Sequence, residues 1–165
     1  MKPRILIEGE GLFLTEPTAV IWPDGVRRQA SFQNLRVRNS PKKMCPEAIA
    51  RDVHAEIEIL GNDDKVLIGP IAGRWADTDQ PDGDWRKSTK PLEQVEIGLG
   101  VSRELGVLMQ HPGGPIYVIN NESWKYPKLA KPEYEIKADS FKVRVRLIGI
   151  HVDELFIFNL NGDIS

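Results

Sequence analysis

The sequence predicts an all-β fold in which about nine short antiparallel strands form a sandwich or a barrel. Three observations favour this class. Ile and Val total 28 residues against 14 Leu and 9 Ala, and β-branched side chains prefer strands. Gly and Pro supply 26 of the 165 residues, which indicates frequent turns. Several segments alternate apolar and polar residues with the period of two that a half-buried strand requires.

The composition limits the classes of protein to which this chain can belong. The chain has 22 basic and 24 acidic residues, a net charge of −2, so we expect no nucleic-acid partner. Ile, Leu, Val and Phe total 47 residues, enough for one packed domain over residues 1–165. No apolar run approaches the ~20 residues of a membrane span, and we find no signal peptide. We expect the chain to be cytoplasmic or to be a soluble domain of a membrane-anchored parent protein. Cys45 is the single cysteine, so an internal disulfide is excluded.

The strands are predicted, in chain order, where apolar and polar residues alternate or where a short apolar run lies between turns. The clearest are residues 4–8, 32–39, 51–60, 93–101, 141–148 and 155–160, and weaker ones are 65–68, 105–109, 116–120 and 134–138. Residues 46–60 also fit a helix. We favour a short helical turn over 46–49 and then a strand, because the turn residues 61–64 suit a hairpin. Residues 155–160 are apolar on both faces except at Asn159, which indicates a strand covered on both sides or an edge under a loop.

Charge on the strands favours one topology. The outer faces of 32–39 and 141–148 are basic, and those of 51–60 and 93–101 are acidic. Opposite charges on neighbouring strands contribute about 0.2–1 kcal/mol per pair. An immunoglobulin-like sandwich places its second strand beside its fifth and its third beside its sixth, which sets each basic strand beside an acidic one. We therefore predict an immunoglobulin-like sandwich of about 7–9 strands, and a salt-bridge ladder rather than an anion-binding patch for the stripe Lys142, Arg144 and Arg146.

Two segments resemble a known group of modules. Residues 35–39 (LRVRN) and 50–57 (ARDVHAEI) resemble the V-x-N … A-x-x-V-x-V-x-I pattern of CARDB-type and related immunoglobulin-like modules of bacteria and archaea. Residues 141–160 look like the final hairpin of such domains, and Arg74-Trp75 looks like a recurrent R-W pair in bacterial proteins that carry them. The resemblance covers about half of the chain. It implies a prokaryotic β-sandwich used for adhesion, spacing or contact with proteins and glycans, and it brings no catalytic residues.

Two long loop excursions, residues 69–91 and 111–133, are where we expect function, because binding residues concentrate on loops. They contain the candidate ligand-binding residues Trp85, Trp124 and Tyr126. Exposed aromatic rings can stack on sugars, whereas buried rings would only hold the loops in place. Trp75, which follows an apolar stretch, is predicted to belong to the core.

The acidic segment 77–84 (DTDQPDGD) supplies four carboxylates, those of Asp77, Asp79, Asp82 and Asp84. Calcium prefers closely spaced carboxylate and carbonyl oxygens, but Asp, Pro and Gly also form ordinary surface turns. It is not an EF-hand loop, because Pro81 occupies the third ligand position, Asp82 stands where the obligatory glycine belongs, and no glutamate follows at the twelfth position. We expect no cofactor, with calcium bound to this loop as the alternative.

No catalytic constellation is visible. His54, His111 and His151 are far apart in sequence and have no zinc-type spacing to other ligands, and there is no G-x-S-x-G motif. We therefore predict that the protein is not an enzyme. The expected function is a non-catalytic interaction or structural module that contacts another protein. The alternative is a carbohydrate-binding module, stabilised by calcium, that uses the loop aromatics.

Overall fold

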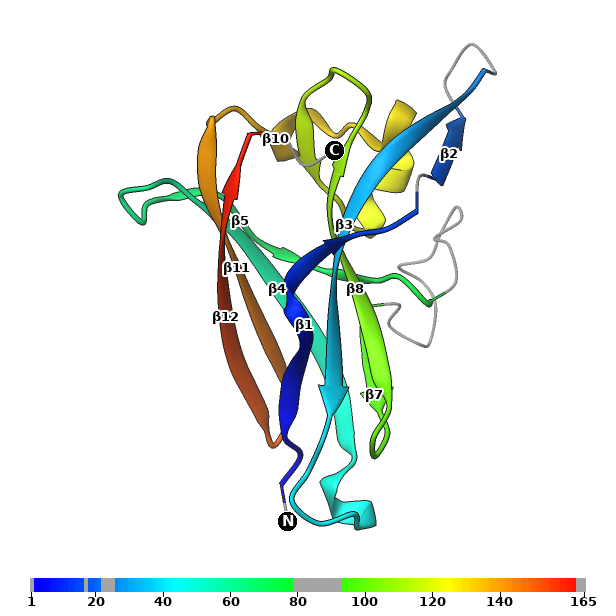
Figure 1. Cartoon of the computed structure of the whole chain (residues 1–165), viewed down its shortest axis with the longest axis vertical. Helices are drawn as coiled ribbons and strands as arrows, with labels where there is room; N and C mark the ends of the chain where they lie inside the picture. The colour runs from blue at the N-terminus through cyan, green and yellow to red at the C-terminus, as the bar shows by residue number, and fades with distance from the viewer. Residues whose placement is uncertain (1, 17, 22–25, 79–92, 163–165) are drawn as a thin grey trace.

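The computed structural model describes residues 2–16, 18–21, 26–78 and 93–162. Their fold is mostly β, as predicted, with two antiparallel sheets packed together (Figure 1). Twelve strands are formed in the described residues, more than the 7–9 predicted. The excess consists of short strands that the alternation pattern does not signal, such as β2 (Thr18–Ile21) and β6 (Arg74–Trp75).

The first sheet has the order β1-β3-β8-β9-β10, and β2 pairs with β3 while β6 pairs with β8. The bounds of its remaining strands are β1 Ile5–Leu14, β3 Arg27–Asn39, β8 Ser102–Gln110, β9 Ile116–Val118 and β10 Glu135–Ile136. Three 3-10 turns follow β9: η3 (Asn121–Lys125), η4 (Pro127–Leu129) and η5 (Pro132–Tyr134). The second long excursion is therefore built of short ordered elements.

The second sheet has the order β12-β11-β4-β5, and β7 pairs with β4. Its strands are β4 Ala50–Leu60, β5 Val66–Ala72, β7 Val95–Ile97, β11 Ser140–Ile150 and β12 Val152–Asn161. The predicted helical turn is confirmed as η1 (Pro46–Ala48), with Pro46 in its first turn.

The core lies between the sheets and follows the predicted alternation. Val53, Ala55, Ile57 and Ile59 of β4 are fully buried, as are Val143, Val145 and Leu147 of β11. The prediction that Trp75 belongs to the core is confirmed, because its side chain is fully buried and its indole N–H donates to the Glu93 carbonyl at 3.2 Å.

The predicted charge ladder between β4 and β11 is confirmed. Glu58 lies opposite Arg144 in the register, and Arg144 donates to both carboxylate oxygens of Glu58, at 2.9 and 3.2 Å. Arg146 instead donates to Asp153 across the β11–β12 hairpin. The basic stripe is thus largely neutralised by partners on neighbouring strands.

The predicted pairing of residues 93–101 with residues 32–39 is wrong. Residues 93–101 were expected to lie beside β3, but β3 pairs with β8, and only residues 95–97 of that segment form a strand, β7, which pairs with β4. The segment ends in a turn in which Val101 N–H donates to the Gly98 carbonyl. Arg36 of β3 accordingly pairs with Glu104 of β8 rather than with Glu93 or Glu96.

Candidate functional site

The predicted aromatic site is only partly described. Trp124 is half-buried in η3, and the Arg74 guanidinium carbon lies 4.7 Å from the centre of its ring. Tyr126 follows η3, with the Lys131 Nζ 5.9 Å from its ring centre. Trp85 lies outside the described residues. The structure therefore gives Trp124 a packing role on a buried cation.

Sequence reasoning did not assign a role to the buried side chain of Arg74. Its guanidinium donates to Asn121 Oδ1 at 2.8 Å and to the Thr78 carbonyl at 3.1 Å. Asn120 caps the start of η3. Its side chain accepts a hydrogen bond from Glu122 N–H at 2.9 Å and donates one to the Ala72 carbonyl at 3.0 Å. These bonds tie η3 to β5 and β6 and satisfy donors of the buried Arg74 guanidinium.

The acidic segment 77–84 is described only at its start. The Asp77 carboxylate lies 3.0 Å from Arg103 Nε, so this carboxylate is neutralised by a strand residue. Asp79, Asp82 and Asp84 lie outside the described residues. Within the described ranges, His, Cys, Asp and Glu side chains form no group of three that could hold a metal ion.

Among the described residues, β1 and β12 face each other on one side of the sandwich without pairing, and their unpaired edges form a second candidate site (Figure 1). The two strands approach at Gly11 of β1, where a Cβ would lie 3.1 Å from the Phe158 ring. Over ten successive residue pairs β12 is bonded to β11 with no irregularity in the register. In the part of the chain that the structure describes, no strand pairs with the other edge of β12, and β1 likewise pairs on one side only. Both edges therefore present backbone donors and acceptors that no neighbouring strand uses.

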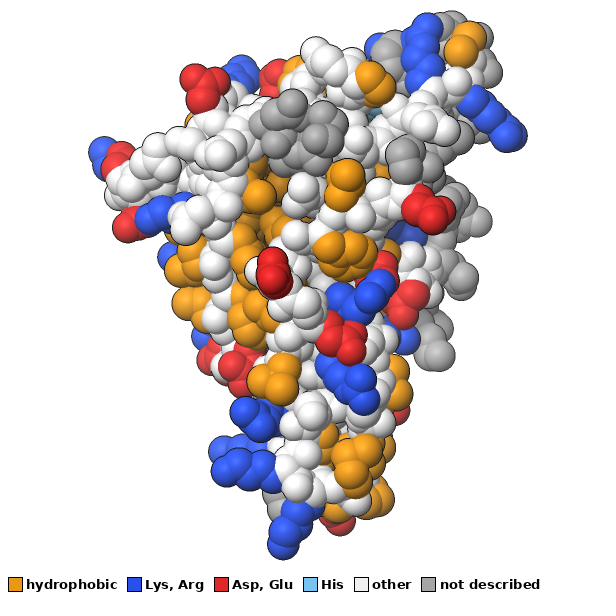
Figure 2. Space-filling model, viewed as in Figure 1, with side chains coloured by type: hydrophobic (Ala, Val, Ile, Leu, Met, Phe, Trp, Pro, Cys, Tyr) orange, Lys and Arg blue, Asp and Glu red, His pale blue; other side chains and the backbone are white. Residues whose placement is uncertain are grey.

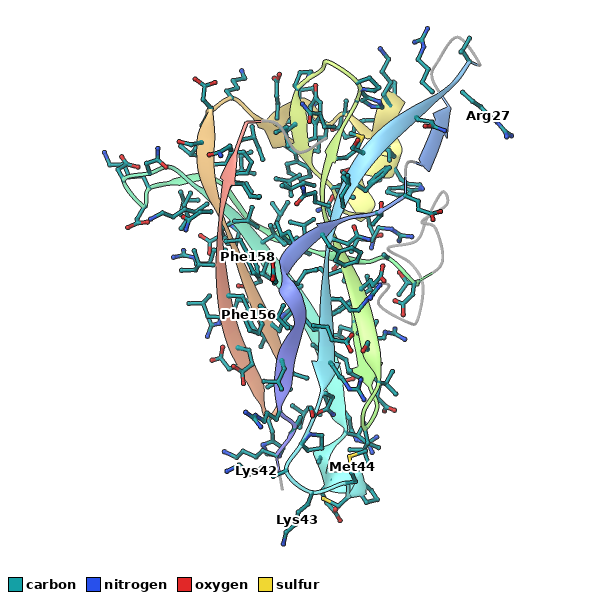
Figure 3. The ribbon with its side chains drawn as sticks, in the orientation of Figure 1. Arg27, Lys42, Lys43, Met44, Phe156 and Phe158 are labelled. Carbon is teal, nitrogen blue, oxygen red and sulfur yellow. The ribbon has the colours of Figure 1, made fainter. Side chains whose placement is uncertain are left out.

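The middle of β12, Leu155–Phe158, is apolar on both faces of the strand, whereas Asp153, Glu154, Asn159 and Asn161 are polar. Leu155 and Ile157 point to the outer face and are 56% and 52% exposed. Phe156, Phe158 and Leu160 point to the inner face and are half-buried against the core. Figure 2 shows apolar side chains at the surface on this side, and Figure 3 shows Phe156 and Phe158 along it.

Residues 155–160 were predicted to be covered on both sides or to be an edge under a loop. They form an edge, but their outer face is exposed. Sequence alone could not decide this, because the apolar pattern is the same in either environment.

The basic side chains of β11 near this edge are paired with carboxylates. Arg146 holds the pKa of Asp153 below its ordinary value by donating two hydrogen bonds to the carboxylate. Arg144 is bonded to Glu58, and Lys142 Nζ lies 2.6 Å from Asp64. Residues 155–160 contain neither a charged residue nor proline. The site thus offers backbone hydrogen bonds and apolar contacts rather than charge.

The helical segments in the described residues are short 3-10 turns, and none is long and apolar enough to cross a bilayer. No known family model matches the chain, and neither the curated proteins nor the solved structures contain a match.

Proposed function

We propose that the protein is a non-catalytic, immunoglobulin-like module that binds an extended segment of a partner protein by adding it as a strand beside β12. The observation that carries this proposal is the edge itself. It is ten residues long and regular, and its middle, Leu155–Phe158, is apolar on both faces. Strand addition obtains affinity from backbone hydrogen bonds and specificity from alternate side chains.

Unprotected edges of this kind are uncommon in stable proteins. Natural edge strands are guarded by Lys or Pro, by bulges, or by brevity, since an open edge recruits other strands. The central part of β12, residues 155–160, uses none of these guards. A binding function gives a physical reason for retaining the open edge.

The direction of the strands suits an added segment. β1 and β12 run the same way along the side of the sandwich where they face each other (Figure 1), so a segment antiparallel to β12 is antiparallel to β1 as well. Its side chains would alternate, one set meeting Leu155 and Ile157 and the other meeting Phe156 and Phe158. The expected partner segment is therefore uncharged and apolar on both faces.

The strand order supports the immunoglobulin-like assignment. In such sandwiches one sheet has the order A-B-E-D and the other contains C, F and G. Here β1, β3, β8 and β6 are neighbours in the first of these orders, and β4, β11 and β12 in the second. The strands β9 and β10 extend the first sheet beyond that pattern.

The experiment is a selection of random peptides of about ten residues on the purified protein, followed by amide hydrogen exchange. We expect enriched peptides with alternating apolar residues, and slower exchange of β12 amides in their presence. Ile157→Lys should remove binding, because a lysine on an edge strand opposes the addition of another strand.

The matched control is Leu67→Lys, which places the same charge at an exposed position of β5, the other edge of this sheet. It should bind the selected peptides as the wild type does. Peptides that bind Ile157→Lys equally well, or that slow exchange in another strand, would contradict the proposal.

Carbohydrate binding is the alternative function, and the loop aromatics carry it. Stacking on a sugar requires an open ring face. Trp124 gives one face to Arg74, which reduces what it offers a ligand. This alternative would be favoured if the wild-type protein is retained on a polysaccharide and the folded Trp124→Ala variant is not.

A further inference from the structure

Three segments meet at one end of the molecule around Asn39, the last residue of β3. Asn39 N–H donates to the Val101 carbonyl at 3.2 Å, and Gly100 N–H donates to the Asn39 carbonyl at 2.8 Å. Arg4 N–H donates to the Asn39 side chain at 3.1 Å. We call this end the tip; it consists of residues 2–4, the loop 40–47 and the turn 98–101 (Figures 1 and 3).

The tip ends in exposed apolar side chains. Met44 is 65% exposed and Val101 is 46% exposed. The two belong to adjacent segments, since the Met44 methyl carbon lies 3.6 Å from where a Cβ on Gly100 would be. Pro46 is exposed as well. Apolar residues at the end of a tapering surface have little neighbouring protein to cover them.

Basic side chains lie at the same end, where Figure 3 shows Lys42 and Lys43 near Met44. Lys2, Arg4, Lys42 and Lys43 are exposed, and none forms an ion pair within the described ranges. The exposed acidic residue of the same loop is Glu47. By contrast, Arg38 on the adjoining strand is 3.3 Å from a Glu8 carboxylate oxygen. The tip therefore has an excess of positive charge on a chain whose net charge is −2.

From this arrangement we propose that the tip docks on an anionic lipid surface, with Met44 and Val101 entering the headgroup region and the lysines facing lipid phosphates and carboxylates. Charge complementarity favours the lipid, because a basic cluster is attracted to the negative surface potential of such membranes. Apolar side chains beside basic ones add to interfacial binding. The proposal is independent of strand addition at β12.

Other partners fit the tip less well. A nucleic acid would use the lysines but not an exposed Met44 and Val101. A stable protein interface needs about 800 Å² on each partner, for which the narrow end of the molecule is poorly shaped (Figure 1). A membrane surface accepts a convex, narrow contact.

The test is sedimentation of the whole chain with phosphatidylcholine vesicles that contain either no phosphatidylserine or about 30% of it. We expect binding to the phosphatidylserine vesicles alone, and a loss of binding between about 0.1 M and about 1 M salt, where the Debye length shortens. Lys42→Glu combined with Lys43→Glu should lower partitioning at least about tenfold. Met44→Ser should weaken binding without changing its salt dependence.

The control variant reverses two exposed cations at the other end of the molecule, Arg27→Glu and Lys137→Glu, and changes the net charge by the same amount. It should bind nearly as the wild type does. Each variant is first compared with the wild type by thermal melting, so that unfolding is not mistaken for loss of binding. The proposal is overturned if the wild type does not sediment with either vesicle, or if the control loses as much binding as the tip variant.

Discussion

The side chain of Asn39 shows how one buried amide can organise a whole end of a fold. It is fully buried and donates to the Ala48 carbonyl at 2.7 Å and to the Ile97 carbonyl at 3.1 Å. It also accepts the Arg4 N–H. Four segments of chain therefore depend on a single residue for the satisfaction of buried backbone groups.

We expect Asn39→Ala to lower the free energy of unfolding by about 2–4 kcal/mol, because buried groups lose their partners. Urea denaturation measures the change. The control is Asn62→Ala, which removes an exposed side-chain hydrogen bond to Ser140 and should cost less than about 1 kcal/mol. Equal losses in the two variants would contradict the role given to Asn39.

The sequence predicts Asn39 at the end of the strand 32–39, but it cannot reveal this role. The bonded carbonyls are 9 and 58 residues away along the chain. An amide at the end of a strand is equally consistent with a surface turn. The role of Arg74 could not be predicted from the sequence for the same reason, because its hydrogen bond to Asn121 joins residues 47 apart in the chain.

Glu8 makes stability depend on acid pH. The Ser102 hydroxyl donates to its carboxylate at 2.6 Å, and this bond, with Arg38 nearby, holds the Glu8 pKa below its ordinary value of 4.5. A lowered pKa in the folded state means that the stabilisation is present above pH 4.5 and is lost as pH falls through the folded-state pKa.

We therefore expect the difference in melting temperature between the wild type and Glu8→Gln to be constant near neutral pH and to shrink below about pH 4.5. Thermal melts over a pH series measure it. The control is Glu133→Gln, at an exposed glutamate of η5. A difference that stays the same down to the most acidic pH at which the protein folds would contradict this expectation.

At the scale of the elements, the pairing of β4 with β11 was predictable because charge and burial agree on it. Both strands alternate strictly, and their outer faces carry opposite charge. Residues 93–101 show how such a pattern misleads. The apolar alternation Val95, Ile97, Leu99 continues into a turn, where Gly100 has φ +68°, so alternation predicts a longer strand than forms.

The ladder between these strands is testable by a double-mutant cycle on Glu58 and Arg144. Their side chains are partly buried and bonded through two contacts, so we expect a coupling energy of about 1 kcal/mol. Glu58→Arg alone should destabilise, and adding Arg144→Glu should restore part of the loss. The control pair is Arg51 and Glu96, at 3.4 Å and more exposed, which should show little coupling. Comparable coupling in both cycles would contradict the argument.

For the whole molecule, alternation predicted the layered architecture but not which surface remains open. Alternation records only whether a side chain faces the core or the solvent. Whether a strand is central or at an edge depends on the order of strands, which long-range contacts decide. The identity of β12 as an open edge, and hence the candidate site, was therefore beyond what residues 155–160 could show by themselves.

The placement of β1 and β12 also has a mechanical consequence. β1 begins at the tip, whereas β12 ends at the opposite end of the molecule (Figure 1). A force that pulled Lys2 and Gly162 apart would draw each of these strands along its own axis. The hydrogen bonds to β3 and β11 lie across that axis, so they would be loaded in shear and together rather than unzipped one at a time. The fold is thus arranged to resist tension along its long axis.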